Sequence, residues 1–160
     1  MKIQPATLNN TNDILALNDR FVAVTSPMDA AQFQHLLEIS SLCIVAENDG
    51  EILGFVLAMT KQDTYENGNF QWFKDRLNNF VYIDRIVVAA DGRGAGVGSQ
   101  LYEHITEWAR QRDLLLIAAE MDLVPPNEAS LKFHQKKGFV ALGQRILESG
   151  KTVSMQVMPI

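Results

Sequence analysis

The sequence is poor in the features that mark secreted and membrane proteins. It has a single cysteine among its 160 residues, Cys43, which cannot form an internal disulfide. Its longest uninterrupted apolar run, 114–119, is much shorter than the ~20 residues of a membrane-spanning helix. Residues 1–10 have no apolar core of the kind found in signal peptides. We therefore expect a cytoplasmic protein with no membrane segment, in which Cys43 is a small core residue.

Positive charge and metal-binding side chains are scarce as well. Lysine and arginine number 14 against 19 aspartates and glutamates, which gives a formal net charge of −5, and no basic block stands out. This balance argues against nucleic acid as a partner. One cysteine and three scattered histidines form no metal-ligand spacing, and the sequence lacks the G-x-S-x-G elbow of serine hydrolases. We therefore expect neither a metal site nor serine-hydrolase chemistry.

What is present is a globular composition with clear periodicity. With 47% hydrophobic and 21% charged residues, the chain is expected to form one domain, residues 1–160, around a single core. A polar stretch and the aromatics after it, 62–77, predict a loop followed by a short helix or an ordered loop. Asp29 and Asn127 are helix-capping residues, and Asn48-Asp49-Gly50 predicts a tight hairpin turn. The other predicted elements are strand 3–7, helices that begin near 11 and 30, strands 42–47, 51–61 and 81–90, helix 99–112, strand 114–122, helix 128–137, and strands 139–148 and 152–158.

The most informative stretch is Arg93-Gly94-Ala95-Gly96-Val97-Gly98, which connects the predicted strand 81–90 to the helix 99–112. Glycines let a backbone approach a ligand closely, and the first N–H groups of a helix have no partner inside it, so this turn predicts a phosphate site. The glycine spacing matches neither the dinucleotide fingerprint G-x-G-x-x-G nor the Walker A loop. What it matches is Arg-x-x-Gly-x-Gly, and the alternative is an ordinary glycine-rich turn between a strand and a helix.

A second segment reads Asn127-x-x-Ser130-x-x-Phe133-His134 and is followed by Gly138-Phe139. Together with the apolar run Ile86-Val87-Val88 and the Arg-x-x-Gly-x-Gly turn, in this order, it resembles the motifs of the GNAT family of acetyl-CoA-dependent N-acetyltransferases. The order of the predicted elements along nearly the whole chain is similar to that of the family too. Within the family, residues 25–29, 81–85 and 125–127 are similar to those of an uncharacterised bacterial branch of predicted acetyltransferases.

The resemblance implies an α/β (α+β) fold, with a mixed, mostly antiparallel sheet, helices on both faces, and a central pair of parallel strands that splay apart. Acetyl-CoA would bind in the splay as a co-substrate. Backbone N–H groups of the glycine-rich turn would hold its pyrophosphate, the apolar strand would bind its pantetheine, and an N–H near Val88 would stabilise the oxyanion. The coenzyme-binding residues implied in this way are Ile86, Val87, Val88, Arg93, Gly94, Ala95, Gly96, Val97, Gly98, Ser99, Asn127, Ser130, Phe133 and His134.

Two residues are candidates for proton transfer. Strand alternation places Glu120 and Asp122 on one face of their strand and Tyr82 and Asp84 on one face of the central strand. Some members of the family carry a glutamate at about this place, so Glu120 is the predicted general base; the alternative is a solvated carboxylate at a strand end. Many members use a tyrosine where this chain has His134, so His134 is either the acid that protonates the departing thiolate or a structural histidine.

Direct transfer of an acetyl group to an amine, without a covalent enzyme intermediate, is the activity that the resemblance implies. The alternative is a non-catalytic module that binds or senses CoA, which the missing tyrosine favours, and transfer of another acyl group is also open. The acceptor, a small-molecule amine or a peptide amine, has no motif; the segment 62–77, the first two helices and the last hairpin are expected to line its pocket. Dimerisation is common in the family, so a homodimer stays open.

Overall fold

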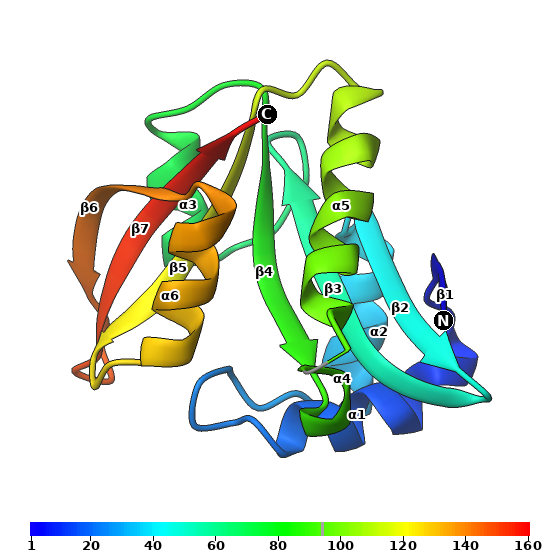
Figure 1. Ribbon diagram of the computed structural model, residues 1–160. Helices are drawn as coiled ribbons and strands as arrows, with labels where there is room; N and C mark the ends of the chain where they lie inside the picture. Colours follow the sequence, from blue (N-terminus) through cyan, green and yellow to red (C-terminus); the bar gives the residue numbers. More distant parts are fainter. Residues whose placement is uncertain (94) are drawn as a thin grey trace.

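The computed structural model describes residues 1–93 and 95–160, and of Arg93 the backbone alone. Its elements follow the predicted order (Figure 1). The strands are β1 (Lys2–Pro5), β2 (Leu42–Asn48), β3 (Glu51–Thr60), β4 (Phe80–Val88), β5 (Leu116–Val124), β6 (Val140–Ile146) and β7 (Thr152–Pro159). The helices are the 3₁₀ turn η1 (Leu8–Asn10), α1 (Thr11–Asp19), α2 (Ala30–Ile39), α3 (Gly68–Lys74), α4 (Ala90–Arg93), α5 (Val97–Arg110) and α6 (Glu128–Lys137).

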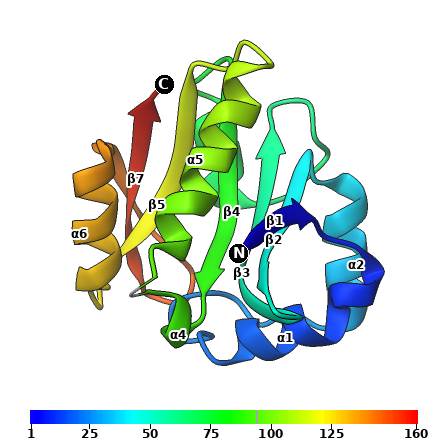
Figure 2. The ribbon, with the colours of Figure 1, turned by 45° about the vertical axis from the view of Figure 1, so that its right-hand side comes forward.

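Within the described residues, the strands form one sheet in the order β1-β2-β3-β4-β5-β7-β6. All neighbours run antiparallel except β4 and β5, which are parallel. The helices α1, α2 and α3 cover one face and α5 and α6 the other (Figure 1 and Figure 2). This is the mixed, mostly antiparallel sheet with helices on both faces that the sequence predicts.

Local signals set most of the element ends. The side chain of Asp29 accepts from the N–H of Gln32 and begins α2, and Asn127 accepts from the N–H of Ser130 and begins α6. Gly138 ends α6 with φ 106°, a left-handed conformation that glycine adopts without strain. These three ends confirm the prediction.

Other ends differ from the prediction. The strand predicted to reach Ala90 stops at Val88, because the N–H of Ala89 makes the last bond to β3, at Leu53, and the chain then turns into α4. Helix α5 begins at Val97, two residues early, because Gly96 serves as its N-cap. The segment after β3 forms a helix, α3, rather than a loop over 67–69, because the side chain of Asn67 caps it.

The parallel pair is short, and this creates the space for a site. Strands β4 and β5 pair only where residues 80–82 lie beside residues 116–118. Beyond Tyr82 and Ala118 the two strands diverge, so the predicted splay is present. Each sheet face has its own apolar core, one under α1, α2 and α3 and one under α5, and both cores reach the edge of this gap. Among the described residues, no helix is long and apolar enough to span a membrane.

Candidate active site

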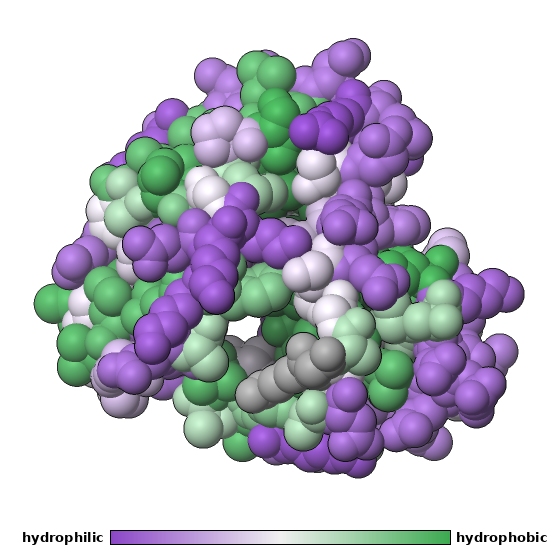
Figure 3. Space-filling model, in the orientation of Figure 1, coloured by the Kyte–Doolittle hydropathy of each residue, from purple (hydrophilic) through white to green (hydrophobic). Residues whose placement is uncertain are grey.

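A cavity of about 910 Å³ occupies the gap between β4 and β5. Residues from both faces of the sheet line it, so it connects the α5/α6 side with the α1/α3 side, and this face of the molecule is hollowed near its centre (Figure 3). Of the residues predicted from sequence, Val97 is instead buried in the core beneath α5, Ala95 is exposed away from the cavity, and Gly94 and the side chain of Arg93 lie outside the described residues. The predicted residues that do line the cavity are Ile86, Val87, Val88, Gly96, Gly98, Ser99, Glu120, Asn127, Ser130, Phe133 and His134.

The N-terminus of α5 faces this cavity. Gly96 has φ 74° and makes no side-chain cap, and the first helical bond that α5 makes runs from the N–H of Gln100 to the carbonyl of Gly96. Among the described residues, the N–H groups of 97–99 therefore have no acceptor. Gly98 lies against Phe133 of α6, where a Cβ would come within 3.3 Å of the ring. The combination of orphan donors, the positive helix end and a close backbone approach suits a bound anion.

Strand β4 presents the second set of unpaired backbone groups. The N–H of Ala89 donates to Leu53 of β3, and the backbone of an antiparallel strand alternates between its two sides. The backbone of Val87 therefore also faces β3, whereas the N–H and C=O groups of Ile86 and Val88 point into the gap. An extended ligand can add to this edge as a further strand would.

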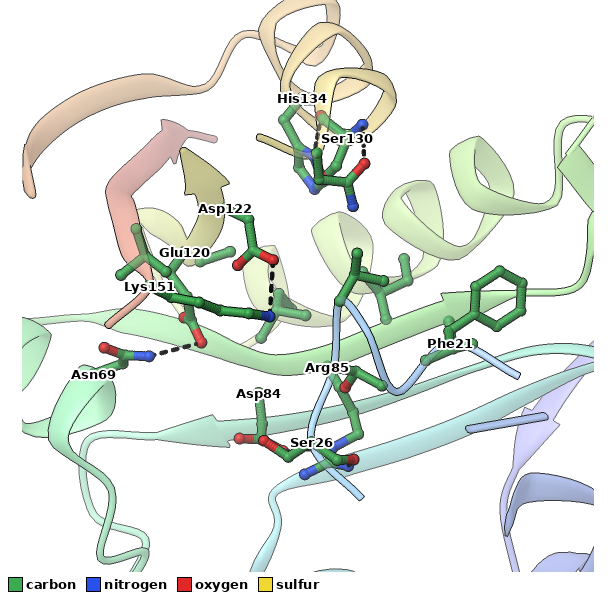
Figure 4. A pocket seen from close by; sticks show the side chains of 18 of the residues that line it. Phe21, Ser26, Asn69, Asp84, Arg85, Glu120, Asp122, Ser130, His134 and Lys151 are labelled. Carbon is green, nitrogen blue, oxygen red and sulfur yellow. Dashed lines mark hydrogen bonds and ion pairs between the residues drawn. The ribbon is translucent and has the colours of Figure 1, made fainter. Parts of the chain in front are cut away.

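Glu120 lies on the α3 side of the gap, where the Nδ2 of Asn69 donates to its carboxylate over 3.0 Å (Figure 4). The hydroxyl of Tyr82 donates to both carboxylate oxygens of Glu120 over 2.9 Å. Desolvation, and then the charge of Asp84, raise the pKa of Glu120 to about 7, while the two hydrogen bonds work against that rise. Burial and the nearby carboxylates keep the pKa of Tyr82 well above its usual value, so Tyr82 is the donor. Glu120 is thus a carboxylate fixed by hydrogen bonds, with a pKa suited to proton transfer near neutrality.

Asp84 forms a neighbouring ion pair that the sequence does not predict. Its carboxylate accepts from the Nε of Arg85 over 2.9 Å and from the hydroxyl of Tyr65 over 2.7 Å. The Nη1 of Arg85 donates to the carbonyl of Ser26 and to the Oδ1 of Asn18. Buried Arg85 therefore fixes the loop between α1 and α2, residues 20–29, beside the cavity.

His134 has partners for both ring nitrogens. Its Nδ1 lies 2.7 Å from the carbonyl of Ser130, which can only accept, so Nδ1 carries the proton. Its Nε2 lies 2.7 Å from the hydroxyl of Tyr102 and accepts from it. Burial lowers the pKa of His134 and keeps the ring neutral. Of the two roles open from sequence, these contacts favour the structural one, with Tyr102 as the group that His134 holds.

The remaining wall of the cavity comes from the segment 65–69 and the hairpin between β6 and β7, both predicted to surround the acceptor, and from the loop 20–29. The first two helices were predicted to line the acceptor pocket, but the loop that connects α1 to α2 lines the cavity in their place. Lys151 of that hairpin reaches across the cavity (Figure 4), and its Nζ donates to the carboxylate of Asp122 over 3.2 Å and to the carbonyl of Ala23 over 2.8 Å. Asn69 and Arg145 meet on the same wall. Sequence reasoning missed these polar residues because no motif marks them and their partners are distant in the chain.

Comparisons with known proteins agree with this geometry. The model of the acetyltransferase (GNAT) family matches residues 10–139. The fold is similar to Ard1 from Thermoplasma volcanium, with a TM-score of 0.80, 16% identity and coverage of 99% of this chain and 97% of that one. It is also similar to the ribosomal-protein-S18-alanine N-acetyltransferase from Escherichia coli, with a TM-score of 0.75, 15% identity and coverage of 99% and 93%.

A third similar structure holds the coenzyme. It is that of a candidate streptothricin acetyltransferase from Bacillus anthracis in complex with acetyl coenzyme A, with 25% identity, a TM-score of 0.58 and coverage of 76% of this chain and 63% of that one. No curated protein matches the sequence significantly. Since the family model spans most of the chain and the mixed sheet with its splayed parallel pair is present, the chain belongs to the GNAT family of acetyltransferases.

Proposed function

We propose that this protein transfers an acetyl group from acetyl-CoA directly to the nitrogen of an amine. The observation that carries the proposal is that one cavity joins the unpaired donors of α5 and β4 to Glu120, a carboxylate with a pKa of about 7. An anion site and a general base on opposite sides of the same gap are what acyl transfer between a phosphorylated donor and an amine requires.

The described residues fit acetyl-CoA, which would supply the acetyl group as an electrophilic thioester. The N–H groups at the start of α5, Val97, Gly98 and Ser99, would hold its pyrophosphate, and Arg93 and Gly94 belong to the same motif. The free backbone groups of Ile86 and Val88 would bind the pantetheine amides, with the side chain of Phe133 against the glycine turn. The N–H of Val88 would donate to the carbonyl oxygen as it gains charge, which is typically worth about 3 kcal/mol in the barrier.

Glu120 would take the proton that the attacking amine loses. The amine nitrogen forms a bond to the carbonyl carbon, the carbon–sulfur bond breaks, and the proton passes from Glu120 to solvent. A thiolate is stable enough near neutral pH to leave and to take its proton from water. His134 would then be a positioning residue, because its Nδ1–H is held by Ser130 and its Nε2 accepts from Tyr102.

Calorimetric titration with acetyl-CoA and with CoA tests the coenzyme half. We expect micromolar binding by the wild type and loss of about 100-fold or more in Gly96→Glu, which adds bulk and negative charge at the anion site. Gly50→Glu is the matched control, because Gly50 also has a positive φ, 81° against 74°, and open space for a side chain, but it lies in the turn between β2 and β3. Equal binding by the two variants would contradict the site.

Turnover tests the catalytic half. Free thiol should be released when acetyl-CoA meets a broad panel of amines, and Glu120→Gln should abolish the release without weakening acetyl-CoA binding. If the wild type binds acetyl-CoA and acetylates no amine, the chain is a CoA-binding module instead.

A further inference from the structure

We propose that the acceptor is a small amine with a carboxylate on the adjacent carbon, as in a free α-amino acid, and that Arg145 binds the carboxylate. This inference rests on the proposed function and assigns the substrate class of the same site. It starts from a survey of the charged groups that line the acceptor side of the cavity. Most of them neutralise one another, since Asp84 is paired with Arg85 and Asp122 with Lys151.

Two charges on that wall are left without an ionic partner within the described residues, Glu120 and Arg145, while Glu148 is exposed at the rim. The side-chain amide of Asn69 joins Glu120 to Arg145. The Nδ2 of Asn69 donates to Glu120, and its Oδ1 accepts from the Nη1 of Arg145. A carboxylate accepts only and a guanidinium donates only, so these partners fix which way the amide points. One amide group and two hydrogen bonds thus separate the guanidinium from the carboxylate of Glu120.

The guanidinium has capacity to spare. Within the described residues, its Nε and Nη2 donate to no protein acceptor. Gly68 makes room for it, because a Cβ at this position would come within 2.8 Å of Nη2. A fixed guanidinium with free N–H groups that lines a cavity is suited to a carboxylate, which it can bind through two parallel hydrogen bonds.

The spacing selects the class of amine. An amine placed at Glu120 is separated from Arg145 by a single hydrogen-bonded amide, so the anionic group must be carried close to the nitrogen. A peptide N-terminus has a neutral amide at that place and would leave Arg145 unpaired. The wall is also closed on this side, because Lys151 links the β6–β7 hairpin to the carbonyl of Ala23 across the cavity. Both features favour a free amino acid over a peptide chain.

A purely structural role for Arg145 predicts a different effect on the acetylation rates. If it served only to orient Asn69, and Asn69 only Glu120, then its loss would slow the acetylation of every amine by the same factor. Recognition of a carboxylate changes instead the ratio of kcat/KM for an acid to kcat/KM for its neutral analogue. That ratio is therefore the quantity to measure.

The experiment compares the common L-α-amino acids with their α-carboxamides as acceptors, at saturating acetyl-CoA, by release of free thiol. We expect at least one amino acid to exceed its own carboxamide in kcat/KM by about 10- to 100-fold, the range for a hydrogen bond to a charged group. In Arg145→Gln the ratio should fall close to one. Gly68→Ala, which displaces the guanidinium without removing it, should lower the ratio in the same direction and guards against misfolding of the first variant.

The control is Arg110→Gln, because Arg110 is exposed at the end of α5 and does not line the cavity. It should keep the ratio of the wild type. Carboxamides that react as well as the acids, a ratio that survives in Arg145→Gln, or intact acetyl-CoA binding with no amino acid acetylated would each overturn the inference. Failure to bind acetyl-CoA at all would refute the proposed function instead, so the two failures are distinguishable.

Discussion

The hydroxyl of Tyr82 donates to both carboxylate oxygens of Glu120, at 2.9 Å from each. Tyr82 is fully buried in β4, and Glu120 comes two residues after Ala118, where the pairing of β5 with β4 ends. The short parallel ladder between these two strands therefore fixes the contact. The bond favours the ionised carboxylate and opposes the desolvation that raises the pKa of Glu120 to about 7. Tyr82 therefore increases the ionised fraction of Glu120.

Tyr82→Phe should shift the acid limb of the pH profile. In the wild type, kcat/KM should rise with pH through about 7, as Glu120 loses its proton. Without the hydroxyl the pKa of Glu120 rises further, and the limb should move to higher pH by about one unit, the equivalent of one hydrogen bond to a charged group. Initial rates measured from about pH 5.5 to about pH 9, a span that covers a group titrating near neutrality, would show this shift of the acid limb. A limb that stays in place or moves to lower pH would show that Glu120 is not the base.

Glu120→Gln should remove activity and change how stability depends on pH. Loss of a general base lowers kcat by about 10²- to 10⁴-fold. The pKa of Glu120 is raised from 4.5 in the unfolded chain to about 7 in the folded one, so the folded state binds the proton more tightly. The wild type should therefore lose stability as pH rises from about 4.5 through 7, because the native state holds more protons than the unfolded state in that window.

Urea unfolding at about pH 5 and about pH 8, on either side of neutrality, tests the direction in which stability changes with pH. On going from the lower to the higher pH, the variant should lose less stability than the wild type, by on the order of 2 kcal/mol, since Glu120 keeps some exposure to the cavity. Parallel behaviour of the two proteins would mean that the carboxylate is ordinarily solvated, which was the alternative open from sequence.

The backbone geometry on the α5 side of the cavity was predictable from the sequence because it is local. The backbone donors on this side come from the contiguous stretch between Ile86 and Ser99, where the glycines and the turn from strand to helix can be recognised in the sequence. The cap at Asn127 and the end at Gly138 fix the second segment in the same way. The single-domain prediction and the roles of individual site residues stay predictions.

The individual contacts on the α3 side of the cavity were not predictable, because they join distant parts of the chain. Asn69 is 51 residues from Glu120, Arg145 is 76 from Asn69, and Lys151 is 128 from Ala23. No periodicity relates such residues, and only the sheet order β5-β7-β6 brings the last hairpin beside α3. The pKa of Glu120 could not be predicted for the same reason, since it depends on desolvation and on Asp84 from another strand.

Lys151→Met should loosen the wall over the acceptor side. The variant keeps the apolar stem and loses the bonds to Ala23 and Asp122, while the bonds from Arg85 and Asn18 to the carbonyl of Ser26 in the loop 20–29 remain. We expect faster amide hydrogen exchange in residues 21–27 and a loss of stability below about 1 kcal/mol, because the ion pair is partly exposed. Bulkier amines should become relatively better acceptors.

Lys136→Met is the matched control for this variant, since Lys136 is exposed on α6 and does not line the cavity. It should leave both exchange and acceptor preference unchanged. If Lys151→Met behaves like Lys136→Met, the bridge from the hairpin to the loop does not restrict the acceptor.

A double-mutant cycle on Tyr102 and His134 distinguishes the two roles that sequence left open for His134. His134→Phe fits among the rings of Tyr102, Phe133 and Phe139 but leaves the buried Tyr102 hydroxyl without its acceptor, which should cost about 1–3 kcal/mol of stability. Adding Tyr102→Phe removes the orphaned hydroxyl as well, so the double variant should recover most of that loss. With His134 as a positioning residue, kcat should fall less than about tenfold in both variants. A fall of about 100-fold or more that the double variant does not recover would instead identify His134 as the acid that protonates the thiolate.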